Sequence, residues 1–173
     1  MVKEDIDMAN KQVKVKLVRE NAQMPERKNG NWFDIYTSGA RILKKNEIKG
    51  SFKLPLEPTI FDGIIHYNEG DVVILYLGIA TDLGKGYEAN MISRSSFFMN
   101  TGLLLSNSIG LMDDCFCGDK DEWRAVCYAT RAGALKIGDR HMQFTVKKTG
   151  VFDLEEVETL GNPSRGGYGS TGK

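Results

Sequence analysis

Short β-rich segments separated by glycines constrain this chain more than any other feature of its sequence. Val13–Leu17 and Phe33–Tyr36 alternate apolar and polar residues, which predicts strands with one solvated face. The unbroken apolar run Val72–Leu77 predicts a strand buried on both faces. Only Ser96–Leu103 has the periodicity of a short helix, so the pattern favours an all-β sandwich, barrel or jelly roll. Further strands are predicted over residues 87–92, 123–129 and 140–146.

The charge balance excludes several classes of function. Lys plus Arg (23) equals Asp plus Glu (23), and the net charge of +0 argues against the basic field that gathers nucleic acid or anionic lipid. The polar first dozen residues, and the lack of an apolar run of about 20, predict a cytoplasmic protein without a membrane partner. Cys115, Cys117 and Cys127 match neither a disulfide framework nor the spacing of zinc ligands.

Glycine also divides the chain into its expected parts. Residues 1–160 are predicted to form one β domain, with an insertion near residues 50–70 that mixes proline, aromatic and acidic residues. Residues 161–173, GNPSRGGYGSTGK, contain five glycines and one proline and have little to bury. This segment is therefore predicted to be a flexible C-terminal arm.

Two segments combine side chains that suit a phosphorylated ligand. In Ser93-Arg94-Ser95-Ser96 a guanidinium fork lies between hydroxyl donors, a combination that binds phosphate, although a helix N-cap would use the same serines. Asp113 precedes Phe116 after an apolar stretch, where a carboxylate could activate water beside an aromatic wall. Turn formation alone would also favour Asp and Gly there.

Two later segments offer further polar groups. Gln143 lies in a predicted strand and could donate from its amide, or be an ordinary strand residue. In the tail, a glycine-rich backbone could wrap a phosphate with hydroxyl and guanidinium donors while an aromatic ring stacks on a base. The candidate tail residues are Arg165, Tyr168, Ser170 and Thr171.

Taken in order, these segments resemble the five motifs of the homotrimeric dUTP pyrophosphatases (dUTPases), bacterial and phage branch. Asn31–Tyr36 is similar to the first motif and Ser93–Ser96 to the second. Asn107–Asp119 resembles the third, Gly138–Phe144 the fourth and Arg165–Gly172 the fifth. The resemblance covers most of residues 13–173.

The resemblance implies a jelly-roll subunit of the β-clip type with at most one short helix, assembled as a homotrimer with active sites between subunits. It implies hydrolysis of dUTP to dUMP and pyrophosphate, with Asp113 as general base for a water that attacks the α-phosphorus in line. Asp34 would hold Mg²⁺ through water. The phosphates would be bound by Arg94, Ser95, Gln143, Arg165, Ser170 and Thr171, the uracil edge would be read by Asn107 and the hairpin backbone, and Ser96 and Gly110 are further candidates for substrate contact.

Some positions depart from the family pattern. Phe116 stands where the family usually has a tyrosine against the deoxyribose, so exclusion of a 2′-hydroxyl is expected to survive on steric grounds. The lid over the uracil is expected either from Tyr168 or from the region of Trp123 and Arg124.

Three alternatives remain open at this point. A dCTP deaminase has a related fold and an Arg-Ser-Ser motif, but residues 123–129 lack the carboxylate that it would need. A phage dUTPase could also bind a regulatory protein, with residues 50–70 as the candidate surface that could be deleted without loss of hydrolysis. A structural jelly-roll protein without catalysis would leave Arg94, Asp113 and the tail unexplained.

Overall fold

The computed structural model describes residues 11–48, 50, 53–55, 57–150 and 152–164. Most of these residues belong to an antiparallel β fold with one short helix, as predicted. None of the described helices is both long and apolar enough to cross a membrane. The strands are β1 (Lys14–Leu17), β2 (Phe33–Tyr36), β3 (Gly39–Leu43), β4 (Ile64–Tyr67), β5 (Val72–Tyr76), β6 (Ile79–Asp82), β7 (Tyr87–Ser93), β8 (Leu103–Leu105), β9 (Gly110–Met112), β10 (Arg124–Ala129), β11 (Gly133–Lys136) and β12 (Arg140–Lys148), and the helix is α1 (Phe97–Thr101).

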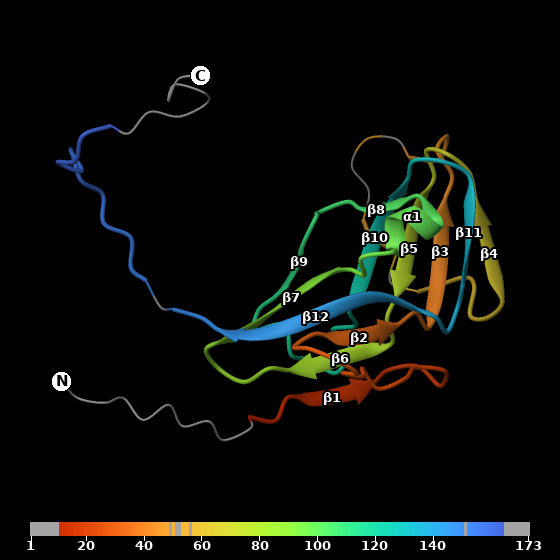
Figure 1. Ribbon diagram of the computed structural model, residues 1–173, viewed down its shortest axis with the longest axis horizontal. Coiled ribbons are helices and arrows are strands. Elements are labelled where there is room, and N and C mark those ends of the chain that lie inside the picture. Colours follow the sequence, from red (N-terminus) through yellow and green to blue (C-terminus); the bar gives the residue numbers. More distant parts are fainter. Residues whose placement is uncertain (1–10, 49, 51–52, 56, 151, 165–173) are drawn as a thin grey trace.

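Two four-stranded sheets carry most of the structure (Figure 1). One has the order β3-β5-β10-β8 and the other the order β2-β12-β7-β9, while β1 pairs with β6 and β11 with β4. Apolar side chains of both large sheets meet in one buried core. Trp123, just before β10, meets Phe144 of β12 edge to face at 4.9 Å between ring centroids, so the two sheets are joined through aromatic packing.

The helix is shorter than its sequence pattern predicts. Gly102 ends it in the left-handed conformation (φ 73°), and the amide of Gly102 donates to the carbonyl of Phe98 at 2.7 Å. Ser96 is the N-cap residue, as one interpretation of the serines expected, but its hydroxyl makes no capping bond. The hydroxyl therefore remains available to a ligand.

The segment predicted as an insertion is partly a core element. Its last residues form β4, in which Ile65 and Tyr67 are each 2% exposed and the Tyr67 hydroxyl donates to the carbonyl of Thr101 at 2.8 Å. Removal of residues 50–70 would therefore take a strand out of the core. The position of β4 in the core argues against the expectation that this whole segment could be deleted without affecting hydrolysis.

The chain beyond β12 leaves the body of the domain. Residues 152–164 extend away from both sheets (Figure 1). Four of their side chains are large, apolar and exposed to solvent: Phe152, Leu154, Val157 and Leu160. Exposed apolar residues at this density are typical of a surface that another chain covers.

Candidate active site

The first group of predicted site residues meets where β2, β12 and the end of β7 lie side by side. Asp34 of β2 faces Gln143 of β12 in the strand register, and Arg94 follows directly after β7. The Arg94 Nε lies 3.0 Å from Asp34 Oδ1, and the Gln143 amide donates to the Ser93 carbonyl at 3.5 Å. Strand pairing thus brings together three predicted residues that are far apart in the sequence.

Two further residues, Arg140 and Glu26, belong to this group and were not predicted from the sequence. Arg140 of β12 contacts Asp34 Oδ2 at 3.1 Å and Glu26 Oε1 at 3.0 Å through one Nη1 atom. Glu26 lies beside Asp34 because their backbones form an isolated antiparallel bridge, and it also accepts the Tyr36 hydroxyl. The name arginine cluster is used below for Asp34, Arg94, Arg140, Glu26 and Tyr36. Its signal in the sequence was the arginine inside the fourth motif.

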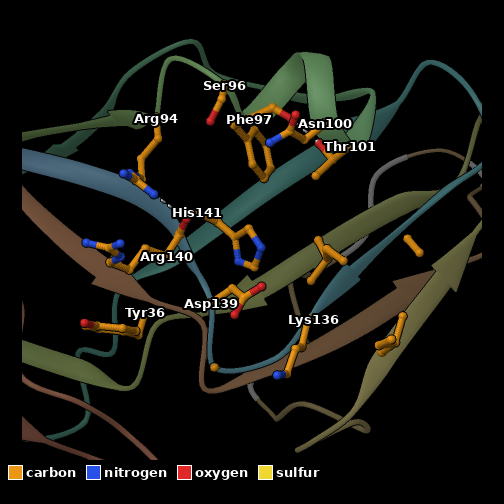
Figure 2. Close-up of a pocket in the computed structure, with 14 residues that line it drawn as sticks. Tyr36, Arg94, Ser96, Phe97, Asn100, Thr101, Lys136, Asp139, Arg140 and His141 are labelled. Carbon is orange, nitrogen blue, oxygen red and sulfur yellow. Dashed lines mark hydrogen bonds between the residues drawn. The ribbon is translucent and has the colours of Figure 1, made fainter.

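The arginine cluster opens onto a cavity of about 570 Å³ (Figure 2). The guanidinium groups of Arg94 and Arg140 lie near one another at one side, and Ser96 lines the same cavity. Arg94 is further fixed by a bond from its Nη1 to the Arg140 carbonyl at 3.3 Å. Two oriented guanidinium forks and a hydroxyl are donors of the kind that can bind a phosphate chain.

The charges of the cluster are balanced, because two guanidinium groups pair with two carboxylates. Hydrogen bonds from Tyr36, the principal cause, together with Lys28 and Arg140, hold the pKa of Glu26 below its usual value. The two arginines share two carboxylates, so an incoming polyphosphate would exchange protein carboxylates for phosphate oxygens as their partners. Such charge-assisted bonds are among the strongest polar contacts in proteins.

His141 lines the inner part of the cavity and is 8% exposed. Its Nδ1 lies 2.8 Å from the Thr37 hydroxyl, and burial lowers the pKa of the imidazole to about 4, while Asp139 opposes and Arg94 reinforces the shift. Because the unfolded histidine titrates near 6.5, the unfolded chain binds the proton first as the pH falls. Stability from this group is complete above about pH 6.5 and is lost between about 6.5 and 4.

We expect His141→Gln to reduce the pH dependence of stability in that window. The shift corresponds to at most about 3 kcal/mol for the wild type. Urea unfolding at a fixed protein concentration, at pH 7 and pH 4.5, measures the change for both proteins. Since Gln has no titrating group, the wild type should lose clearly more stability than the variant on acidification; equal losses would contradict the assignment.

The second group of predicted residues lies elsewhere. Asn107 lies in the turn between β8 and β9, which was predicted as a hairpin but joins strands of two different sheets, with β8 paired to β10 and β9 to β7. Gly110 begins β9 and Phe116 follows that strand; all three residues line a pocket of about 250 Å³. An added Cβ at Gly110 would approach the Met91 Cε to 2.8 Å, so the end of the flexible Met91 side chain would have to shift. The hairpin pocket, as it is called below, is lined by Leu54, Asn107, Gly110, Leu111, Met112, Phe116, Glu122, Trp123 and Arg124.

Asp113 lies next to the hairpin pocket. It is exposed, it follows Met112, and its carbonyl accepts the Phe116 amide at 3.1 Å. This turn brings the backbone of Phe116 back to Asp113, and the Phe116 side chain lines the pocket. Arg124 joins the pocket from β10, which places one of the two expected lid regions at the same hollow as Asn107 and Phe116.

Within one chain the two groups are at opposite ends of β7. Met112 pairs with Ala89 near the start of β7, while Arg94 follows its last residue, Ser93. Five residues of extended strand span roughly 17 Å. A single chain therefore does not bring Asp113 and Arg94 to one phosphorus atom.

The other predicted site residues are Ser95 and four residues of the tail. Ser95 is exposed and is not among the residues that line the cavity of the arginine cluster. Arg165, Tyr168, Ser170 and Thr171 lie outside the described residues. Among the described residues, no group of three or more His, Cys, Asp or Glu side chains could hold a metal ion.

Comparison with known proteins decides the family. The chain is 35% identical over 163 residues to the SPbeta prophage-derived deoxyuridine 5′-triphosphate nucleotidohydrolase YosS of Bacillus subtilis, covering 93% of this chain and 98% of the relative. The chain belongs to the dUTPase family. A second dUTPase, from Heliobacterium modesticaldum, is 28% identical over 174 residues, which cover 92% of this chain and 96% of that protein.

Solved structures agree with the fold of a dUTPase. A variant of the Staphylococcus bacteriophage 80alpha dUTPase bound to dUpNHpp superposes with a TM-score of 0.64 at 17% identity, over 94% of this chain and 99% of that chain. A phage phi11 dUTPase variant, described with a structural Mg(II) ion, gives a TM-score of 0.62 at 16% identity, over 87% of this chain and 99% of that chain. No protein-family model matches this dUTPase. The predicted family is confirmed, and the deaminase and structural-protein alternatives find no support among these relatives.

Proposed function

We propose that this dUTPase hydrolyses dUTP to dUMP and pyrophosphate, with the base and sugar in the hairpin pocket and the phosphates at the arginine cluster. The observation that carries the proposal is the division of polar groups between the two sites. One site offers an amide, an aromatic ring and a neighbouring carboxylate, and the other offers two oriented guanidinium groups. Release of pyrophosphate from dUTP in the presence of Mg²⁺ tests it.

Asp113 is proposed as the general base. Asp113 directly follows Met112, which lines the hairpin pocket, and this proximity to the proposed base and sugar site supports a role at the α-phosphate. Asp113 would align a water and accept its proton as the water oxygen attacks the α-phosphorus in line with the pyrophosphate leaving group. Arg94, Arg140 and Ser96 would orient the phosphate chain and stabilise its charge, and Gln143 is proposed to add an amide donor.

The residues around Asp34 fit a water-mediated role toward Mg²⁺. Each carboxylate oxygen of Asp34 accepts from one arginine and keeps a second lone pair. Mg²⁺ binds few protein carboxylates and keeps several waters beside the substrate phosphates, where it neutralises charge. Asp34 would therefore hold metal-bound water, while its direct partners position the two arginines.

A homotrimer is proposed because the two half-sites need different chains. Met112 and Arg94 lie roughly 17 Å apart along β7, and Asp113 follows Met112 on the side away from Arg94, so a second copy has to supply one of the two site residues. The exposed apolar residues of the segment after β12, with Leu154 99% exposed, support contact with a neighbouring subunit. The glycine-rich arm that follows, with Arg165, Tyr168, Ser170 and Thr171, is proposed to cover a neighbour's site.

Phe116 is expected to exclude ribonucleotides through its ring alone. It lines the hairpin pocket and is 38% exposed, so its face is available to a sugar. We expect wild-type kcat/KM to be much higher for dUTP than for UTP, and Phe116→Ala to raise the UTP-to-dUTP ratio by about 10–100-fold. Phe116→Tyr, which keeps the ring, serves as control. Similar wild-type rates on the two nucleotides would refute this assignment.

A second, regulatory role is proposed for the surface around Phe61 and Ile64, which are 54% and 62% exposed. The structural neighbours from bacteriophage 80alpha are described as controlling the transfer of virulence genes. These exposed apolar side chains would form the surface that a protein partner of this dUTPase binds. Phe61→Ala leaves β4 in place and is therefore a cleaner probe of partner capture than a deletion.

A further inference from the structure

The loop before β4 is fixed to the core at a point that the dUTPase motifs do not require. The Tyr76 hydroxyl is within hydrogen-bond distance of the Pro55 carbonyl at 2.9 Å and of the Glu57 carbonyl at 3.0 Å. Arg41 donates to the same Glu57 carbonyl at 3.4 Å, and Arg19 pairs with the Glu57 carboxylate at 3.1 Å. Tyr76 lies in the buried strand β5 and is 0% exposed, so the loop is held by a rigid element.

This anchoring fixes Leu54 at the hairpin pocket. Leu54 is one of the residues that line the pocket, and the following Pro55 restricts its backbone to extended conformations. Tyr76 also connects the loop to Arg124, its partner in the β5–β10 register, whose Cζ lies 5.5 Å from the Tyr76 ring centroid. One tyrosine thus touches both the loop that carries Leu54 and an arginine of the pocket.

A bound uracil ring would present two chemically different edges to the pocket, and one of them suits an aliphatic side chain. Uracil has one polar edge, with O2, N3 and O4, and an apolar edge at C5 and C6. Asn107 and the backbone between β8 and β9 suit the polar edge, and Phe116 is assigned to the sugar. Trp123 and Met112 belong to the buried core beneath, and Leu111, which is 66% exposed, is part of β9 itself. Leu54 is the apolar residue that lines the pocket from outside the β8–β9 segment and its flanks.

We propose that Leu54 limits the room at C5 of the bound pyrimidine and so disfavours 5-substituted nucleotides such as dTTP. The proposal rests on the function proposed above, since it assigns the base to the hairpin pocket. Leu54 is then a specificity-determining residue, and Tyr76 is a positioning residue that acts through the loop. Neither residue takes part in the chemical step.

Leu54→Ala tests the proposal. Removing the aliphatic wall should raise the ratio of kcat/KM for dTTP to that for dUTP by about 10-fold, in the range of a methyl-sized change in an apolar pocket. Leu54→Ile, which keeps the volume, should leave the ratio close to wild type. An unchanged ratio in Leu54→Ala, or a change confined to UTP, would overturn the proposal, because the side chain would then not lie at the C5 edge.

Tyr76→Phe provides an independent check. It removes the hydroxyl that holds Pro55 and Glu57 and keeps the ring next to Arg124. We expect a higher KM and a raised dTTP-to-dUTP ratio with kcat for dUTP little changed; a lower kcat with an unchanged ratio would contradict the positioning role. If wild-type protein does not hydrolyse dUTP, the proposed function fails, whereas normal hydrolysis of dUTP with an unchanged Leu54→Ala ratio overturns only the role of Leu54.

Discussion

Replacing Asp113 with Asn should lower the rate of dUTP hydrolysis by about 10²–10⁴-fold while the protein remains folded. The substitution removes the proton acceptor and changes the shape of the side chain very little. Asp113 is exposed, and it uses its backbone carbonyl, which the substitution retains, to hold Phe116. Pyrophosphate release under saturating dUTP and Mg²⁺ measures kcat, and the urea midpoint reports the fold.

Asp119→Asn is the matched control for Asp113. Asp119 lies in the same loop, its side chain is 83% exposed and it pairs with Lys16 at 3.0 Å. An exposed pair of this kind contributes little to stability, and the position has no assigned contact with substrate. Hydrolysis should therefore stay near the wild-type rate. Equal losses in the two variants would show that loop charge, rather than a base at Asp113, governs turnover.

Replacing Arg94 with Gln should lower kcat/KM for dUTP by about 10²–10³-fold. The variant loses the guanidinium fork at the phosphate cavity and the ion pair with Asp34, so both charge stabilisation and positioning are reduced. Steady-state kinetics separate the two effects, since loss of transition-state stabilisation lowers kcat as well as kcat/KM. Lys148→Gln, which removes an exposed charge at the end of β12, should leave both constants near wild type.

The two inactive variants also test how the site is assembled. If each site takes Asp113 from one chain and Arg94 from another, trimers formed by coexpressing Asp113→Asn and Arg94→Gln contain some intact sites. Random mixing of equal amounts gives about a quarter of the wild-type activity for sites shared between neighbouring subunits. Sites built within single chains would all carry one defect, and mixing would then restore nothing.

Much of the fold was predictable because local pattern decided it. The runs at Phe33–Tyr36, Val72–Tyr76 and Arg140–Lys148 became strands, since alternation and β-branched residues specify extended backbone directly. The short strands β8, β9 and β11 have three or four residues each and carry too little periodicity to be recognised. The local sequence predicts an insertion where β4 lies, because the burial of this strand depends on its pairing with β11.

Some residues of the candidate site could also be predicted from the sequence, and others could not. Asp34, Arg94, Asn107 and Phe116 could be chosen as candidates because they lie in segments that resemble dUTPase motifs. Glu26 could not be predicted from the sequence, because its contact with Arg140 depends on the backbone bridge that places it beside Asp34. Leu54 was equally hidden, because its position depends on bonds from Tyr76 that no local sequence pattern encodes.

The length of β7 has a consequence for how this activity responds to the amount of protein present. With the acid near one end of that strand and the guanidinium at the other, the proposed site assignment predicts that a solitary polypeptide is inert however well it folds. Under the proposed assembly, dilution below the concentration at which the subunits dissociate would switch hydrolysis off with every chain still native. Turnover would rise more steeply than linearly as expression begins.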